Sequence, residues 1–172
     1  MKYREYKKIV DQEIYVYSKP KSLLQRIRIK YFTPNTNAIY LCRKMWYLYS
    51  RGGVSRFISN FVMLKIMRRY GCWIAPDVTC ATGFRIQHPV GIVIGGGKIG
   101  ENFTIYQNCT IGTAHNCLEI PEIGNNVTLY AGSSILGNIK IVSNVSIGAN
   151  SLAIRSIEES GTYAGNPCKK IR

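Results

Sequence analysis

The sequence predicts a mainly β protein in which a parallel β-helix follows an α-helical segment. Aliphatic or small residues recur every six positions from Ile74 onward, and Gly or Asn occupies the positions between them where the chain must turn. Residues 1–72 lack this period and show helical stripes instead. We therefore expect a basic α-helical segment over residues 1–72 and a β-helix over residues 73–172, with a loop at 112–122.

The six-residue period keeps its phase at thirteen positions, with one residue inserted before Ile99 and a longer insertion before Ile123. These positions are Ile74, Cys80, Ile86, Ile92, Ile99, Ile105, Ile111, Ile123, Leu129, Ile135, Ile141, Ile147 and Ala153. An α-helix repeats every 3.6 residues and a simple strand every two, so neither fits a period of six. Short parallel strands joined by tight turns do fit it, and Gly and Asn supply the backbone angles that such turns need.

Three segments of this region resemble the hexapeptide-repeat acyltransferases. They are IQHPVGIVIG at 86–95, IYQNCTIG at 105–112 and AGNPCKKI at 164–171. The resemblance covers residues 70–172 and is to the serine-acetyltransferase-like branch, which also includes enzymes that acetylate sugars during polysaccharide assembly. It implies a left-handed parallel β-helix with three hexads per turn, so thirteen hexads predict a little over four coils.

The first 72 residues are strongly basic. They contain sixteen Lys or Arg and three acidic residues, a net charge of +13, whereas residues 73–172 have seven against six, a net of +1. Apolar stripes predict helices at 35–50, beginning at Asn35 or Thr36, and at 54–71, while 22–31 is expected to form a short basic helix. We expect the helices to close the open end of the β-helix, and the basic residues beside Trp46, Tyr47 and Tyr49 leave peripheral membrane contact as a second interpretation.

The composition also limits the other partners. The six cysteines form no CxxC pair and no metal-like group with the histidines, so we expect free thiols and no bound metal. Free thiols are typical of a reducing compartment, so we expect a cytoplasmic protein. The inner face of the membrane is a second location within that compartment. The basic residues lie in helices without a recognition motif, so we expect no nucleic-acid binding. The longest apolar run, 61–67, is short and interrupted by Lys65, so we expect no membrane span.

Acetyl transfer from a thioester to a hydroxyl needs a base, a donor to the developing oxyanion and two substrates in contact. Histidine suits the base because its unperturbed pKa of about 6.5 leaves it largely neutral at neutral pH. His88 lies where the serine-acetyltransferase branch has its catalytic histidine. His115 lies in the loop, an arrangement that resembles galactoside and maltose acetyltransferases. We favour His88 as the base and keep His115 as the alternative.

Several positions depart from the serine-acetyltransferase pattern. Trp73 and Gln87 stand where that branch has aspartates, and Glu119–Ile120 replaces an Arg-His pair. These changes remove charges that would hold a free amino acid, so the expected acceptor is a sugar hydroxyl on a nucleotide- or lipid-linked polysaccharide precursor, with serine as the alternative. The partner that orients His88 stays open among a backbone carbonyl, Glu119 and Asp77.

The resemblance also implies acetyl-CoA as co-substrate and a homotrimer whose active sites lie between neighbouring β-helices. By position, the CoA-binding residues are Gly112, Thr113, Ala131, Gly132, Ala149 and Asn150. Lys169 and Lys170 in the basic tail are expected to meet the CoA phosphates, with a solvated tail as the alternative. A purely structural β-helix is the non-enzyme alternative, but it would need neither the His88 segment nor the loop. A nucleotidyltransferase would need an upstream phosphate-binding domain, for which residues 1–72 provide no Gly-rich strand-turn-helix.

Overall fold

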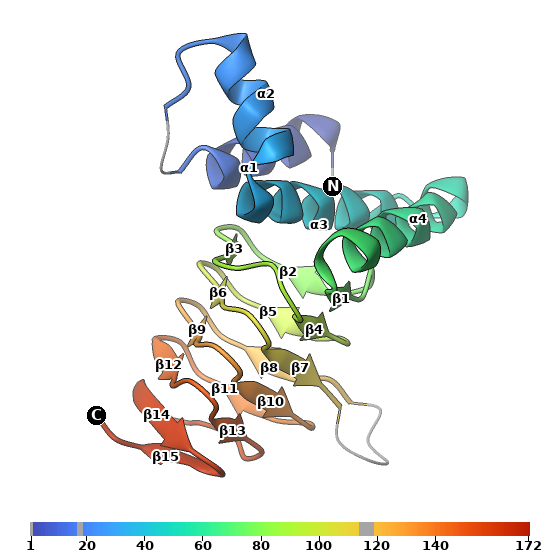
Figure 1. The fold of residues 1–172 in the computed structure, drawn as a ribbon. Helices are drawn as coiled ribbons and strands as arrows, with labels where there is room; N and C mark the ends of the chain where they lie inside the picture. The colour runs from blue at the N-terminus through green and yellow to red at the C-terminus, as the bar shows by residue number, and fades with distance from the viewer. Residues whose placement is uncertain (1, 17–18, 114–118) are drawn as a thin grey trace.

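The computed structural model describes residues 2–16, 19–113 and 119–172. Within these ranges four α-helices come first and are followed by a parallel β-helix of about five turns (Figure 1). The helices lie at one end of the β-helix, and the chain ends at the other end. The predicted fold class is therefore confirmed.

Four helices form the cap in the described part of the chain, and the sequence predicts three of them, at 22–31, 35–50 and 54–71, but not the first. They are α1 (Tyr3–Ile14), α2 (Leu23–Phe32), α3 (Pro34–Ser50) and α4 (Gly53–Tyr70). Ser22 caps α2 by accepting a hydrogen bond from the Gln25 N–H, and Gly71 ends α4 in the left-handed conformation. The predicted start of α3 at Asn35 or Thr36 is wrong by two or three residues. Thr33 is the N-cap, because Pro34 fits the first helical position, where no N–H is needed.

The strands stack into three parallel sheets, one on each face of the β-helix. Sheet A consists of β1 (Trp73–Ile74), β4 (Val93–Ile94), β7 (Thr110–Gly112), β10 (Ser134–Leu136) and β13 (Leu152–Ala153). Sheet B consists of β2 (Thr79–Cys80), β5 (Lys98–Ile99), β8 (Glu122–Ile123) and β11 (Lys140–Ile141). Sheet C consists of β3 (Arg85–Ile86), β6 (Thr104–Ile105), β9 (Thr128–Leu129), β12 (Val145–Ile147), β14 (Gly161–Gly165) and the antiparallel β15 (Cys168–Lys170).

The hexad positions point inward and form the core of the β-helix. Ile105, Ile111 and Leu129 are fully buried there. The predicted position Ile92 is wrong by two residues, because the parallel register pairs Ile94 with Ile111. The sequence predicts a little over four coils, which is most of one turn fewer than the structure contains. The structure completes a fifth turn through a bridge from Ile157 to Ile141 and through β14, where the hexad phase is no longer visible in the sequence.

The helices cover the open end of the first turn. Side chains of α3 and α4 join the β-helix core in one continuous cluster that includes Met45 and Ile66. The Trp46 ring is 8% exposed and its Nε1 donates to the Ala75 carbonyl at 3.1 Å. Trp46 is therefore part of the cap and does not contribute to an exposed interfacial surface, because its ring is needed to pack against Phe84.

Candidate functional site

We call the corner between sheets C and A the His88 corner. The chain crosses it once per turn, so five short segments stack along the axis of the β-helix. In order along the axis they are 87–91, 106–108, 130–132, 148–150 and 164–165. Neighbouring segments lie about one strand spacing apart, roughly 4.8 Å.

His88 belongs to the segment nearest the helical cap, where a tight turn presents its side chain to solvent. The His88 carbonyl accepts a hydrogen bond from the Val90 N–H at 2.8 Å, and Gly91 follows with φ +64°. A Cβ at Gly91 would lie 2.3 Å from Asn108 Oδ1, so this position requires glycine. The local sequence thus fixes an exposed imidazole on a rigid turn.

Two tyrosines continue the corner below His88. The His88 and Tyr106 rings meet at a tilt of 63° with their centroids 6.3 Å apart. The Tyr106 and Tyr130 rings are stacked with centroids 5.2 Å apart. Tyr130 is 41% exposed, so the three rings form an aromatic ladder that ligands can reach from solvent.

Gln107 follows Tyr106 at the same corner. Its Oε1 is buried and accepts no hydrogen bond from any part of the chain that the structure describes. A buried carbonyl without a donor costs about 1–3 kcal/mol, so its retention needs an explanation. A bound molecule would provide one if the side chain turned to expose the carbonyl and accepted a hydrogen bond from that molecule.

Four of the predicted CoA-binding residues lie at the His88 corner. Ala131 and Gly132 belong to the third segment, and Ala149 and Asn150 belong to the fourth. Gly132 has φ +72°, and a Cβ there would lie 2.2 Å from Asn150 Oδ1, so the turn itself requires this glycine. Because their side chains are short, these residues project little from the corner below the tyrosines.

The two predicted lysines lie at the end of this column. Lys169 pairs in register with Ala164, the first residue of the fifth segment, on the antiparallel strand β15. Its side chain is exposed. Lys170 instead forms an ion pair with Glu159 at 2.8 Å, which neutralises part of its charge. Lys169 is therefore the better placed of the two to meet an anion.

Gly112 and Thr113 lie where the strands of sheet A end, on the side away from the His88 corner. Gly112 ends β7, and its carbonyl accepts from the Gly137 N–H at 3.0 Å at the corner between sheets A and B. Within one chain, the structure therefore does not bring Gly112 or Thr113 together with His88. A site containing all three would need a second chain.

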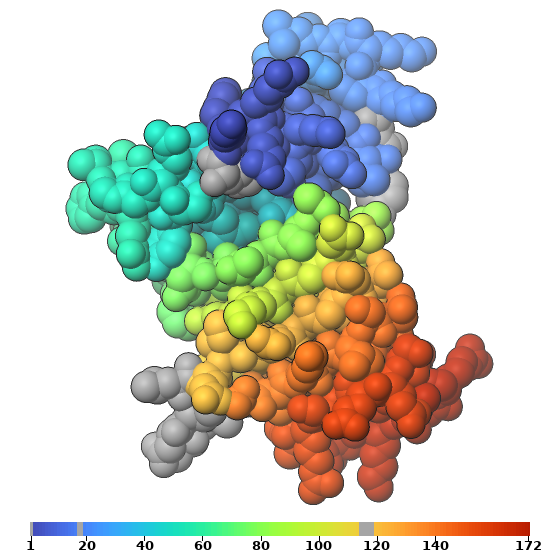
Figure 2. Space-filling model, turned by 180° about the vertical axis from the view of Figure 1, so that it is seen from behind, coloured from blue at the N-terminus to red at the C-terminus, as the bar shows by residue number. Residues whose placement is uncertain are grey.

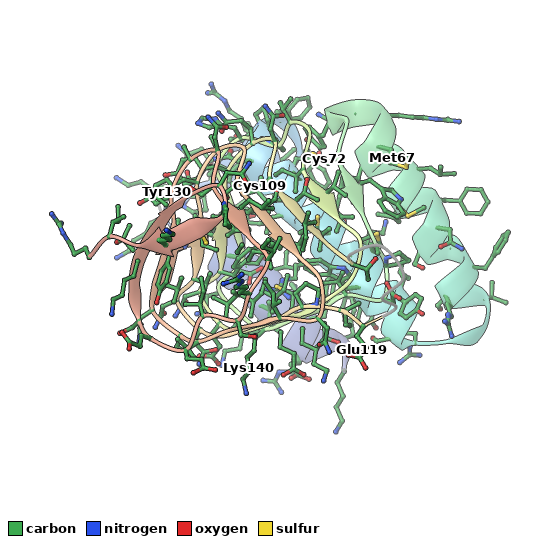
Figure 3. All side chains as sticks on the ribbon, turned by 90° about the horizontal axis from the view of Figure 1, so that it is seen from below. Met67, Cys72, Cys109, Glu119, Tyr130 and Lys140 are labelled. Atoms are coloured by element: carbon green, nitrogen blue, oxygen red, sulfur yellow. The ribbon has the colours of Figure 1, made fainter. Side chains whose placement is uncertain are left out.

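The suggested partners of His88 also lie at that far corner. Asp77 falls between β1 and β2, and Glu119 accepts a hydrogen bond from Asn138 between β10 and β11. Figure 3, seen along the β-helix, places Glu119 and Tyr130 on different sides. Neither carboxylate is therefore beside His88 within one chain. His115, the alternative base, lies outside the described residues.

Trp73 occupies the position where the serine-acetyltransferase pattern has an aspartate. Its side chain is 46% exposed, and Cζ3 lies 3.7 Å from where a Gly95 Cβ would be. The indole thus lies against the end of β4, the strand that follows the His88 corner along the chain.

The sequence interpretation missed Tyr106, Tyr130 and Gln107 as site residues. The signal that finds them is the register: after the inserted residues are counted, Gln87, Tyr106 and Tyr130 occupy the same place on successive turns. Within the described ranges, no group of three or more His, Cys, Asp or Glu residues could hold a metal ion.

Comparison with known proteins gives a consistent set of relatives. No family model matches the chain. A serine acetyltransferase of Staphylococcus epidermidis is 40% identical over 116 residues, covering 65% of this chain and 54% of the relative. One from Staphylococcus aureus is 43% identical over 116 residues, with the same shares covered.

Solved structures extend the similarity to the helical cap. A serine acetyltransferase from Neisseria gonorrhoeae superposes with a TM-score of 0.82 at 27% identity, covering 99% of this chain and 67% of that one. In sequence and in fold the chain is similar to hexapeptide-repeat acyltransferases. The same Neisseria enzyme in complex with serine gives 0.81 at 29% identity, covering 96% and 69%. A serine acetyltransferase in complex with CoA gives 0.79 at 26% identity, covering 97% and 70%.

These relatives bear on the acceptor. All of them are serine acetyltransferases, so they support the alternative, serine, better than a sugar of polysaccharide biosynthesis. The chain spans about half the length, 54%, of the curated relatives it matches.

Proposed function

We propose that this protein transfers an acetyl group from acetyl-CoA to the hydroxyl of a small acceptor, with serine as the first candidate. One observation carries the proposal: His88 stands exposed at one end of a column that passes Tyr106 and Tyr130, continues over small residues at 131–132 and 148–149, and ends at Lys169. Four strand spacings, about 19 Å, separate the first and fifth segments of that column. That span suits an extended pantetheine arm.

His88 would act as the general base. The acceptor oxygen attacks the thioester carbonyl while the imidazole takes the hydroxyl proton, and the carbon–sulfur bond then breaks. The departing CoA thiolate recovers that proton from the imidazolium, so no other reactant is needed. Ala131, Gly132, Ala149 and Asn150 would border the pantetheine arm, and Lys169 would meet the CoA phosphates.

A homotrimer fits the distribution of the predicted residues. Gly112 and Thr113 lie at the far end of sheet A from His88 within one chain, so a neighbouring chain would have to bring them to the histidine. A cyclic trimer supplies three identical contacts of this kind that close on themselves. The active site would then lie between neighbouring β-helices.

A sugar hydroxyl is the second candidate acceptor, because of two features of the His88 corner. Trp73 and Gln87 replace the carboxylates that would hold an amino acid, and the ladder of Tyr106 and Tyr130 offers a face on which a ring can stack. The relatives favour serine and these side chains favour a ring. An assay with both acceptor classes decides between them.

The test is release of free CoA from acetyl-CoA by the purified protein, with serine or with a panel of sugars. Turnover with serine that His88→Ala abolishes and His115→Ala spares supports the first candidate. Turnover with sugars alone would move the proposal to the second. Loss in His115→Ala alone would place the base in the loop, and a protein that releases no CoA with any acceptor would leave a structural β-helix.

A further inference from the structure

Helix α4 carries an apolar stripe on its outer side. Its inner side buries Ser59, Val62 and Ile66 against α3 and the β-helix. The outer residues follow helical spacing and are exposed: they are Val54, Phe57, Ile58, Phe61 and Leu64. Phe57 is 63% exposed and Phe61 is 58% exposed, and their rings contact each other edge to face with centroids 5.2 Å apart.

A helix that is apolar on both sides is normally buried on both sides. No part of the chain that the structure describes covers the outer stripe of α4. Figures 1 and 2 show α3 and α4 projecting sideways beyond the outline of the β-helix, and Figure 3 shows α4 side chains pointing away from the rest of the molecule. The stripe is thus open to a partner.

The charges around the stripe are all of one sign. No Asp or Glu occurs between Glu13 and Asp77, a stretch that contains twelve Lys or Arg residues. Lys65 and Arg68 continue the outer side of α4 where the apolar stripe ends, and neither forms an ion pair among the described residues. The partner must therefore match apolar side chains bordered by cations.

We infer that the outer side of α4 binds an anionic lipid membrane, with the apolar stripe at the acyl boundary and the basic residues at the headgroups. No helix among the described residues is long and apolar enough to cross a membrane, so α4 would lie along the surface. A second copy of this chain complements the stripe poorly. Its cap has a net charge of +13 and its β-helix region has +1, so neither offers net negative charge to the cations beside the stripe.

The experiment is flotation of the full chain with vesicles of pure phosphatidylcholine and with vesicles of equal parts phosphatidylcholine and phosphatidylglycerol. We expect at least about tenfold stronger binding to the anionic vesicles, weakened by high salt. The double variant Phe57→Glu/Phe61→Glu should lose about tenfold or more of that binding, and Lys65→Gln/Arg68→Gln should lose a smaller part.

The control is Ile171→Glu, which places the same charge on a side chain that is 66% exposed at the other end of the molecule. It should bind vesicles like the wild type. Equal loss in Ile171→Glu, or equal wild-type binding to both vesicle types, would overturn the inference. The inference would also be overturned if the wild type floated with neither kind of vesicle and the Phe57→Glu/Phe61→Glu variant had a lower molar mass in light scattering. The stripe would then join copies of the chain. Circular dichroism of each variant establishes that it is folded.

Discussion

Glu13 of α1 and Arg43 of α3 form a buried ion pair that binds the open edge of the first β-helix turn. The Arg43 guanidinium donates to both Glu13 carboxylate oxygens, at 2.6 and 2.7 Å. Glu13 Oε1 also accepts the Gly83 and Phe84 N–H groups, at 2.7 and 2.9 Å. Arg43 donates further to the Cys80 and Ala81 carbonyls. The pair thus satisfies backbone groups that have no strand above them.

Removing one member of this pair should destabilise the protein strongly. Arg43→Met leaves the Glu13 carboxylate buried without its cation, and we expect the free energy of unfolding to fall by about 3–5 kcal/mol. The midpoint of urea unfolding, followed by circular dichroism, measures the effect.

The double variant Glu13→Met/Arg43→Met separates two explanations. If the ion pair mattered only as a pair, two apolar side chains of similar size would restore most of the stability. We expect no such recovery, because the N–H groups of Gly83 and Phe84 and the carbonyls of Cys80 and Ala81 would stay buried without partners. A double variant as stable as the wild type would contradict this role at the edge.

The protein should lose stability in alkaline solution. Burial raises the pKa of the Cys42 thiol, and burial raises the pKa of Cys80 to about 12. An unfolded thiol titrates near pH 8.5, so the folded state retains protons that the unfolded state loses. The contribution is constant below about pH 8.5 and decreases from there to about pH 12, by about 1.4 kcal/mol per pH unit for each such thiol.

Urea unfolding in a series of buffers from neutral to alkaline pH measures this dependence. The Cys80→Ala variant provides the control, since it should flatten the slope while lowering stability at neutral pH only modestly. A stability that stays constant to about pH 10 in the wild type would contradict the expected burial of the thiols.

The sequence predicts the β-helix well because the inward residue of most hexads can be recognised from the residues next to it. Ile105 and Ile111 are buried by a rule that needs only neighbouring residues. It cannot predict the Glu13–Arg43 pair, whose contacts with Gly83 join segments 70 residues apart and depend on how the cap sits on the first turn.

The same reasoning applies to the site. His88 is predictable because its turn is a local motif, with Gly91 required by the approach of Asn108. Tyr106 and Tyr130 are separated from His88 by 18 and 42 residues, and an inserted residue and the loop lie within those separations. Their place beside the histidine follows from the stacking of turns, which a linear motif does not record.

The tyrosine ladder should control how the acceptor binds. Tyr130→Ala removes the outer ring of the stack and should raise the KM for the acceptor by about two- to tenfold, since an aromatic contact contributes about 0.5–1.5 kcal/mol. The KM for acetyl-CoA and the unfolding midpoint should change little, because Tyr130 is 41% exposed. Steady-state kinetics with each substrate varied in turn measures this.

The conservative variant Tyr130→Phe keeps the ring and should retain a KM for the acceptor close to the wild-type value. If Tyr130→Phe is as impaired as Tyr130→Ala, the hydroxyl and not the ring face makes the contact. If neither variant affects either KM, the ladder has no part in binding.

Gln107 should matter more to activity than to stability. Its Oε1 is buried without a donor among the described residues, so Gln107→Met removes a desolvated carbonyl and keeps the length of the side chain. We expect the free energy of unfolding to stay unchanged or to rise by about 1 kcal/mol. If the carbonyl accepts a hydrogen bond from the acceptor or from His88, kcat/KM should fall by about tenfold, the value of one such hydrogen bond. Urea unfolding and CoA release on the same preparations measure both quantities. A stability loss of about 2 kcal/mol or more, with kcat/KM unchanged in the folded fraction, would mean that the amide is a structural group.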